Sequence, residues 1–461
     1  MQKLFDEVSS LDKRCYESFA LNEDILMEQA AANIANYIQS NYYNNEKIVI
    51  VCGLGNNGAD GLALARLLYK RFNVKIYLVD EPKTKMGKLQ YSRVKALNIK
   101  LTKKIKQADI IVDCIFGSGL NRPLREDISQ LLDIINSIKA FKVACDIPTG
   151  INYKGQVQTS AFKADLTITM GALKTSLFLD EAKEYVGEII VGDLGVQREV
   201  YETKSNMYLL DEEDLNLPFR EQKNSHKGNF GHLNVIAGCK KGAGIIAAKA
   251  AFGLGAGLVT VISHEDLDLP YHIMQAHFPV QNCTAIAIGM GLGKFEEKEI
   301  KKILSHDIPI LIDADLFYEK LILDVLHKEV VLTPHPKEFC ALLKLCGIAD
   351  ISIEELQKNR FLYVQKFTAK YSKPVLLLKG ANVIIAQDEK IFINDKGNSV
   401  LSKAGSGDVL SGLIASLLAQ GYNSLNAAIS GSLAHSLAAK NYSKNSYSLI
   451  PSDLIEEVRK L

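Results

Sequence analysis

Short, uniformly apolar runs alternate with helix-like segments along most of the chain, and this alternation constrains the fold more than any other feature. Ile48–Cys52, Ile110–Cys114 and Asp165–Met170 are runs of this kind, and each is followed by a polar or glycine-rich turn. Buried strands that are separated by helices are typical of parallel sheets with helices on both faces. The sequence therefore predicts an α/β fold built on parallel sheets.

The alternation occurs in two series, which predicts two domains. With 461 residues the chain exceeds the roughly 250–300 residues that one core usually supports. The first series ends near 193–196, and residues 197–225 contain charged clusters without a helical or strand period, so we expect a linker there. We assign residues 1–204 to the first domain and 205–461 to the second. Three closely spaced runs near the end predict a hairpin on an otherwise parallel sheet: Val375–Lys379, Val383–Ala386 and Lys390–Asn394.

Composition narrows the class of partner. A net charge of +1 gives no electrostatic reason to expect nucleic acid or a membrane, so we expect a small-molecule ligand. The first residues lack the pattern of a signal peptide, which favours a cytoplasmic protein. None of the eight cysteines forms a CxxC pair, and we expect reduced, buried thiols, including Cys52, Cys114, Cys145 and Cys239.

In the first half, polar groups follow three apolar runs. The turn 53–61 reads GLGNNGADG, Asp113 ends a second run, and Asp146 and Thr149 follow a third. Because the carboxyl ends of parallel strands meet at one edge of a sheet, these groups should converge there. Oxygens of Asn57, Asp113 and Thr149 are suitable ligands for a hard monovalent or divalent cation, and the loop 117–123 is able to grip phosphate. Taken singly, each aspartate could instead cap a helix or a turn.

The second half contains a comparable turn, Lys403–Gly412, which reads KAGSGDVLSG and leads into a helix-forming stretch. Glycines let the backbone approach a ligand, and the free N–H groups of a helix start attract phosphate oxygens. Asp408 would place a carboxylate beside that phosphate, although the same pattern also fits Asp408 as an ordinary N-cap. His335 stands between two prolines, which favours a ligand-binding role over a structural one.

The motifs GNNGAD, VDCIFGSGL and DIPTG resemble the epimerase domain of the NAD(P)H-hydrate repair enzymes over about residues 1–200. The resemblance implies a Rossmann-like three-layer domain that interconverts (R)- and (S)-NAD(P)HX, the hydrated cofactors. It implies K⁺ held by Asn57, Asp113 and Thr149, and an acid/base role for Asp146. It implies these substrate-binding residues: Asn56, Asn57, Gly58, Ala59, Asp60, Gly117, Ser118, Gly119, Leu120, Asn121, Arg122, Pro123 and Asp146. Two departures are mild, namely Ala59 for a glycine and Thr149 for a serine.

Residues 205–461 resemble the ADP-dependent dehydratase domain of the same enzymes, which has a ribokinase-like fold. That resemblance implies contacts to NAD(P)HX from Ala243, Gly291, His335 and Asp408. It implies contacts to ADP from Lys379, Gly380, Ala381, Asn382, Val383 and Gly407, with Mg²⁺ beside the nucleotide. ADP would phosphorylate the ring hydroxyl, with Asp408 as the base, and phosphate would then leave to restore the double bond. Lys337 replaces a glycine usual in the family motif, and Ser399 replaces a proline.

Two other readings remain open at this point. The second half could be a ribokinase-like kinase for a stable alcohol with a regulatory first half, in which case a phosphorylated product would accumulate. The first half could also be a scaffold without catalysis, although its polar groups at strand ends argue against that. From fold analogy alone we expect a homo-oligomer.

Overall fold

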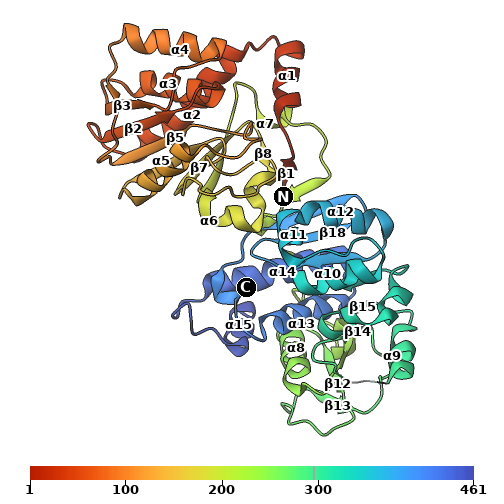
Figure 1. Cartoon of the computed structure of the whole chain (residues 1–461). Coiled ribbons are helices and arrows are strands. Elements are labelled where there is room, and N and C mark those ends of the chain that lie inside the picture. Colours follow the sequence, from red (N-terminus) through yellow and green to blue (C-terminus); the bar gives the residue numbers. More distant parts are fainter. Residues whose placement is uncertain (294–295) are drawn as a thin grey trace. The chain divides into compact units, whose positions relative to one another are not determined.

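The chain forms two compact units, which the computed structural model describes over residues 1–293 and 296–461. The N-terminal unit comprises Lys3–Ser205. The C-terminal unit comprises Asn206–Leu461 together with Met1 and Gln2. Each unit has its own sheet and its own core, so the two are described in turn (Figure 1).

The N-terminal unit is built on a wholly parallel sheet with the order β4-β3-β2-β5-β6-β7-β9. Its strands are β2 (Lys47–Cys52), β3 (Asn73–Leu78), β4 (Leu101–Thr102), β5 (Ile110–Cys114), β6 (Phe141–Cys145), β7 (Leu166–Met170) and β9 (Glu188–Gly192). A short pair, β1 (Gln2–Phe5) and β8 (Leu173–Lys174), is also parallel. The helices are α1 (Ser9–Ser18), α2 (Glu23–Asn41), α3 (Asn56–Leu68), α4 (Lys85–Ala96), α5 (Glu126–Ser137), α6 (Lys183–Val186) and α7 (Arg198–Tyr201).

Alternate residues of the central strands supply the two faces of this sheet. Ile48, Ile50 and Cys52 of β2 belong to the cluster formed with α1, α2 and α3. Val49 and Val51 belong to the cluster formed with α5 on the opposite face. Successive side chains of a strand point to opposite faces, so a strand covered on both sides must be apolar at every position. This confirms the three-layer arrangement predicted from the continuous apolar runs.

The C-terminal unit contains a mixed sheet with the order β13-β12-β11-β14-β15-β16-β17-β18-β19-β10. Its strands are β10 (Met207–Leu209), β11 (His232–Ile236), β12 (Leu258–Ile262), β13 (Met274–Ala276), β14 (Ala285–Ile288), β15 (Ile310–Ile312), β16 (Val330–Leu332), β17 (Val375–Leu378), β18 (Val383–Gln387) and β19 (Lys390–Asn394). Its helices are α8 (Lys241–Gly253), α9 (Glu297–Leu304), α10 (Pro336–Leu345), α11 (Ile353–Lys358), α12 (Arg360–Lys370), α13 (Ser406–Ala419), α14 (Ser424–Asn441) and α15 (Pro451–Val458). The ladders β17-β18 and β18-β19 are antiparallel, as the hairpin predicted.

One large core lies against this sheet. Helices α8, α13, α14 and α15 contribute their apolar residues to it together with alternate residues of the strands, such as Val235 of β11 and Leu311 of β15. Helix α13 also contacts β11, β14 and β15 directly. The helix that opens at the glycine-rich turn is therefore anchored over the centre of the sheet.

Two expectations about the chain were wrong. The segment 197–225 is not a plain linker, because α7 places the buried Tyr201 in the core of the N-terminal unit and β10 pairs with β19. Cys239 is exposed, whereas Cys52, Cys114 and Cys145 are buried as expected. All eight cysteines are free thiols.

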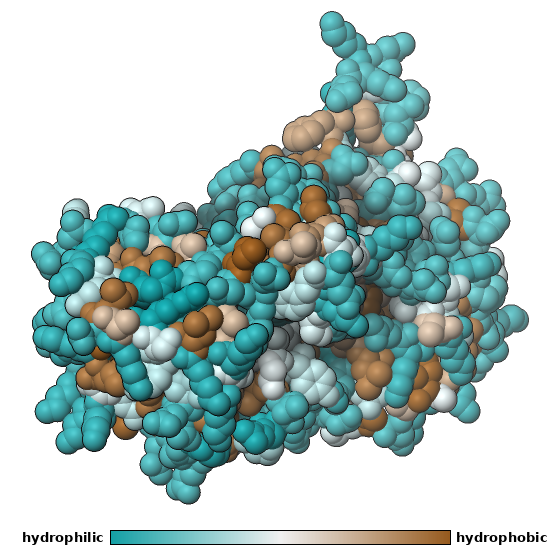
Figure 2. All heavy atoms as spheres, turned by 90° about the horizontal axis from the view of Figure 1, so that it is seen from above, coloured by the Kyte–Doolittle hydropathy of each residue, from teal (hydrophilic) through white to brown (hydrophobic). Residues whose placement is uncertain are grey.

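Hydrophilic residues dominate the face drawn in Figure 2, where hydrophobic ones form small separate groups. Exposed apolar side chains scattered in this way are usual on protein surfaces. Among the described residues, no helix combines the length and the apolar character that crossing a bilayer requires.

Candidate active sites

Three loops of the N-terminal unit meet where the strand order reverses. From β2 the chain moves to β3 on one side and later to β5 on the other, so the crevice between β2 and β5 is a topological switch point, where ligands bind in open α/β sheets. The loops pack too closely for side chains: a Cβ on Gly58 would lie 2.0 Å from the carbonyl oxygen of Gly53. A Cβ on Gly53 would in turn lie 2.1 Å from that of Ile115. Close packing within the turn therefore requires glycine at position 58, and packing against the loop after β5 requires it at position 53.

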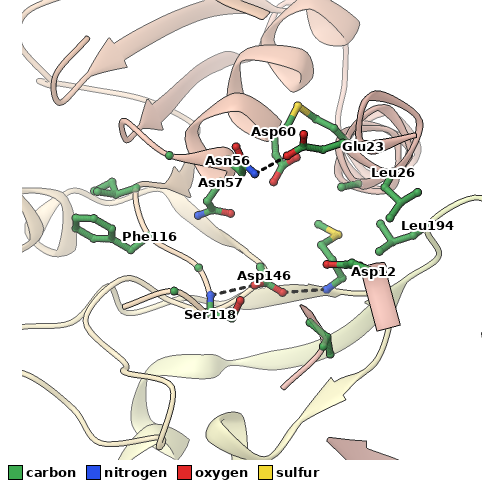
Figure 3. A pocket seen from close by; sticks show the side chains of 18 of the residues that line it. Asp12, Glu23, Leu26, Asn56, Asn57, Asp60, Phe116, Ser118, Asp146 and Leu194 are labelled. Carbon is green, nitrogen blue, oxygen red and sulfur yellow. Dashed lines mark hydrogen bonds between the residues drawn. The ribbon is translucent and has the colours of Figure 1, made fainter. Parts of the chain in front are cut away.

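A cavity of about 400 Å³ opens at this point. Figure 3 shows Asn57 and Asp60 of α3 on one side of it, and Asp146 with Asp12 on the other. The predicted residues Asn56, Asn57, Asp60, Gly117, Ser118, Gly119 and Asp146 all line it. Asp12 and Tyr16 of α1 and Glu23 and Leu26 of α2 line it as well.

Asp146 is held as a carboxylate by a buried lysine. Its Oδ1 lies 2.7 Å from Nζ of Lys174, which is almost wholly buried, and accepts from the backbone N–H of Met170, while Oδ2 accepts from that of Ser118. Burial alone would raise the pKa of Asp146, but the Lys174 charge and these donors hold it below its usual value. Asp146 has a φ of 72°, a left-handed conformation that aspartate and asparagine tolerate better than most residues.

The pKa values of two further carboxyls in the cavity are shifted in the opposite direction, upward. Burial raises the pKa of Asp60 well above its usual value, and the charges of Asp146, Asp12 and Glu23 add to that effect. Burial also raises the pKa of Asp12, against the opposing hydrogen bond from the Tyr201 hydroxyl, which is 2.7 Å long. One cavity therefore holds an aspartate whose pKa is lowered beside aspartates whose pKa values are raised, an arrangement typical of acid/base sites.

Asn57 lines the cavity, whereas Asp113 and Thr149 are fully buried and do not line it. The fully buried Asp113 carboxylate accepts from the backbone N–H of Thr149 at 2.7 Å, from its hydroxyl at 2.8 Å and from the N–H of Ile115. Burial raises the pKa of Asp113 to about 6 despite these donors. Both polar atoms of the Asn57 amide are buried without a hydrogen-bond partner in the part of the chain that the structure describes. The set thus contains a buried carboxylate without an adjacent cationic side chain, and an unsatisfied amide oxygen.

The remaining predicted residues of this unit do not line the cavity. Gly58 and Leu120 are buried, and Asn121, Arg122 and Pro123 are exposed. The fully buried methyl of Ala59 packs with Met27 and Met86, which explains why alanine replaces glycine here. Asp12, Lys174 and Tyr201 were missed because no motif flags them and only the fold brings them to Asp146.

In the C-terminal unit, charged groups converge at the carboxyl ends of β15 and β17 and the start of α13. Lys379 Nζ lies 2.8 Å from Oδ1 of the buried Asp313, whose Oδ2 accepts from the Ser411 hydroxyl at 2.6 Å. Asp408 stands in the first turn of α13. Burial raises the pKa of Asp408, the Asp313 charge raises it further and Lys379 opposes both. Gly407 faces the same lysine, since a Cβ on it would lie 3.7 Å from Nζ.

The start of α13 excludes the interpretation of Asp408 as N-cap. Gly405, with φ of 89°, is the capping residue, and within residues 1–293 and 296–461 no side chain caps the first N–H groups of the helix. The Nε2 atom of the buried His435 contacts Ser406 instead, and burial lowers the pKa of this histidine to about 4, so it is neutral. The first turn therefore leaves N–H groups for an anion, with Asp408 beside them.

Ala243 and Gly291 lie at the switch point of the second sheet, where the order reverses between β11 and β14. A Cβ on Gly291, whose φ is 60°, would lie 3.2 Å from that of Ala243, so the two loops touch. His335 caps α10: its Nδ1 accepts from the N–H groups of Lys337 and Glu338, and its Nε2 lies 3.0 Å from Glu338. His335 therefore has a structural role that the sequence reading ranked second.

The loop Lys379–Val383, predicted to contact ADP, is held from beneath by Arg360 of α12. The guanidinium of this fully buried arginine donates to the carbonyls of Leu378, Lys379 and Asn382. Gly380 and Ala381 lie between those carbonyls in the sequence, so the loop that presents Lys379 is fixed from both ends.

Both halves of the chain match known protein families. Residues 233–460 match a family model described as NAD(P)H-hydrate dehydratase, and residues 23–176 match one described as YjeF-related protein N-terminus. The chain is 44% identical to the bifunctional NAD(P)H-hydrate repair enzyme Nnr of Helicobacter pylori, covering 100% of both chains. It is 31% identical to that of Dictyoglomus turgidum, over 98% of this chain and 96% of the relative. A solved ADP/ATP-dependent NAD(P)H-hydrate dehydratase from Bacillus subtilis is 25% identical, over 56% of this chain and 98% of that one, with a TM-score of 0.48.

Proposed function

Because this chain belongs to the family of bifunctional NAD(P)H-hydrate repair enzymes, we propose that its two sites carry out the two halves of that repair. It epimerises (R)- and (S)-NAD(P)HX and dehydrates the (S) form to NAD(P)H at the expense of ADP, which yields AMP and phosphate. The full-length match, across both units, is the observation that carries this function. We propose residues 1–204 as the epimerase domain and 205–461 as the dehydratase domain.

For dehydration, we propose that Asp408 accepts the proton of the ring hydroxyl as its oxygen attacks the β-phosphorus of ADP. AMP leaves, and the N–H groups at the start of α13 stabilise the charge on the transferring phosphoryl group. The ring C–O bond of the phosphorylated hydrate then breaks, phosphate leaves with the bonding electrons, and loss of a proton from the neighbouring carbon restores the ring double bond. The proximity of Asp408 to Lys379 and Asp313 supports this role, since Lys379 can neutralise charge on ADP.

Substrate and nucleotide are proposed to meet at Asp408. We propose that Ala243, Gly291 and His335 contact NAD(P)HX, and that Lys379, Gly380, Ala381, Asn382, Val383 and Gly407 contact ADP. Mg²⁺ would arrive on the nucleotide phosphates, as is usual for this ion. Asp313 is already engaged by Lys379 and Ser411, so we assign no side chain to the magnesium ion.

For epimerisation, we propose Asp146 as the base and K⁺ as an ion held by Asn57, Asp113 and Thr149. The buried, unsatisfied amide oxygen of Asn57 and the uncompensated carboxylate of Asp113 fit a monovalent cation. When bound, K⁺ would supply positive charge behind the cavity. Asn57 lies in one substrate-binding loop, and Thr149 bonds Asp113 and the N–H of Phe116 in the loop that leads to Ser118. The charge of the ion would therefore hold these loops in place.

Potassium should stabilise the protein more at pH 8 than at pH 5. Since the folded pKa of Asp113, about 6, lies above its ordinary value of 3.8, stability contributed by its protonated form is lost as pH rises through 6. K⁺ would offset that loss by pairing with the carboxylate, and a tenfold excess over its Kd stabilises by ~1.4 kcal/mol, or roughly 3–6 °C in Tm. Calorimetry in KCl against tetramethylammonium chloride measures the difference. An equal gain at both pH values, or the same gain in Asp113→Asn, contradicts the assignment.

The function itself is tested by supplying a mixture of (R)- and (S)-NADHX with ADP. Complete recovery of NADH absorbance requires both activities, whereas recovery of only the (S) fraction means that no epimerase is present beyond the slow spontaneous reaction. Accumulation of a phosphorylated hydrate without NADH would contradict the dehydratase. The same assay with ATP in place of ADP compares the two phosphoryl donors.

A further inference from the structure

We propose that Asp60 is the catalytic acid of the epimerase and works opposite Asp146 as the base, with Lys174 as the positioning residue that keeps Asp146 ionised. This inference rests on the proposed epimerase function of the N-terminal unit. It adds a proton donor and an explanation of how two aspartates in one cavity are kept in opposite protonation states.

The geometry places the two carboxyls across the cavity from each other. Asp60 belongs to α3 and points into the cavity from the side of the turn 53–58, whereas Asp146 follows β6 on the other side (Figure 3). Asp146 is fixed by Lys174 and two backbone N–H groups. Among the described residues, Asp60 has no hydrogen-bond or ion-pair partner, and the Asn57 amide beside it is also unsatisfied. The polar atoms of Asp60 and Asn57 are therefore available to water or to a bound molecule.

The charges around the cavity separate the two protonation states. Carboxylates and other acidic groups face Asp60: Asp12 and Tyr16 of α1, Glu23 of α2, Asp146, and the buried thiols Cys52, Cys114 and Cys145. Within the described residues, no cation contributes to the pKa shift of Asp60. Lys174 instead contacts Asp146 directly, and its charge acts at longer range to lower the pKa of Asp12 against the effect of burial. Burial and like charges raise the pKa of Asp60, while Lys174 keeps that of Asp146 low.

This pair matches what the reaction requires. Water adds to the nicotinamide double bond at the carbon next to the ring nitrogen, because that carbon is the electrophilic end of an enamine. The base removes the hydroxyl proton, the C–O bond becomes C=O, and the C–N bond breaks with its electrons on nitrogen, which takes the proton from the acid. Rotation about the adjacent C–C bond presents the other face of the aldehyde, and reversal of the same steps closes the ring as the other epimer. No external reactant is consumed.

Asp60→Asn tests the acid, because asparagine is of the same size but cannot donate a proton. We expect the catalysed conversion of (R)- to (S)-NADHX, followed by chromatography above the uncatalysed background, to fall by ~10²–10³-fold. Wild-type kcat/KM should decline at alkaline pH as Asp60 ionises, and that decline should vanish in the variant. Near-normal epimerisation by Asp60→Asn, or an unchanged alkaline decline, overturns the proposal.

Lys174→Met tests the positioning role. Methionine fills similar space without charge, so the pKa of Asp146 should rise and the acid limb of the kcat/KM profile should move to higher pH. A lysine that only fills space would lower activity at every pH without moving that limb, which would remove Lys174 from the role.

Two controls separate failure of this inference from failure of the proposed function. Asp133→Asn makes the same chemical change on the exposed side of α5, where Asp133 accepts from Ser160, and should epimerise at the wild-type rate. Dehydration of the (S) epimer by each variant reports the amount of active C-terminal unit, and calorimetric unfolding of each variant reports whether the N-terminal unit is folded. If the wild type itself does not accelerate epimerisation, the proposed function fails; if it does and Asp60→Asn matches it, only this inference fails.

Discussion

Asp408→Asn should slow dehydration of (S)-NAD(P)HX by ~10²–10⁴-fold while epimerisation continues at the wild-type rate, as expected for the loss of a general base. Asparagine keeps the shape of the side chain and the first turn of α13, where Gly405 and not Asp408 is the cap. The loss should therefore appear in kcat and not in folding. Rates of NADH formation from purified (S) epimer with saturating ADP provide the measurement.

The pH dependence gives the same residue a second test. Burial and the Asp313 charge raise the pKa of Asp408, so the base becomes protonated at a higher pH than an ordinary aspartate would. Wild-type kcat for dehydration should fall as pH decreases through that raised value. Asp350→Asn, which alters an exposed carboxylate paired with Lys344, is the matched control. Dehydration within a few-fold of wild type in Asp408→Asn would remove Asp408 from the mechanism.

Asp146→Asn should reduce the catalysed epimerisation by ~10²–10⁴-fold and leave dehydration of the (S) epimer unchanged. Asparagine is the suitable replacement because residue 146 has a φ of 72°, a conformation that alanine would adopt with strain. The substitution also leaves the buried Lys174 charge without its ion-pair partner, so the dehydration rate and the unfolding temperature of the variant are compared with those of the wild type.

The predicted phenotype of this variant is specific. From an equal mixture of epimers with ADP, Asp146→Asn should recover the (S) half as NADH quickly and the rest only at the spontaneous rate. Asp133→Asn should recover all of it at the wild-type rate. Full, rapid recovery by Asp146→Asn would show that another group is the base.

Some features could be read from the sequence because they are local. A strand buried on both faces must be apolar at every position, so Ile48–Cys52 and Ile110–Cys114 were recognisable as central strands of a parallel sheet. The close spacing of Val375, Val383 and Lys390 likewise indicated the antiparallel hairpin. Segment 197–225 was misjudged because Tyr201 and β10 are stabilised by contacts made elsewhere in the chain, which leave no local period.

Some residues of the candidate sites were likewise recognisable from the sequence, and others were not. Asn57, Asp60, Asp146 and Asp408 follow strands in glycine-rich turns, so sequence position alone brought them to the edges where ligands bind. Asp12 and Lys174 carry no such signal. They lie on α1 and β8, far from Asp146 in the sequence, and only the packing of the folded unit makes them its neighbours.

The sequence by itself determined the two α/β units, the loops at the strand ends and the family to which those loops belong. Buried strands and glycine turns produce recognisable patterns within short segments of sequence. The tertiary structure decided which carboxyls are charged. Protonation depends on burial and on the charges within a few ångströms, and these are properties of the assembled cavity: Lys174 holds Asp146 ionised, whereas burial and the charges of Asp146, Asp12 and Glu23 raise the pKa of Asp60. The division of labour between two chemically identical side chains is therefore a product of the fold.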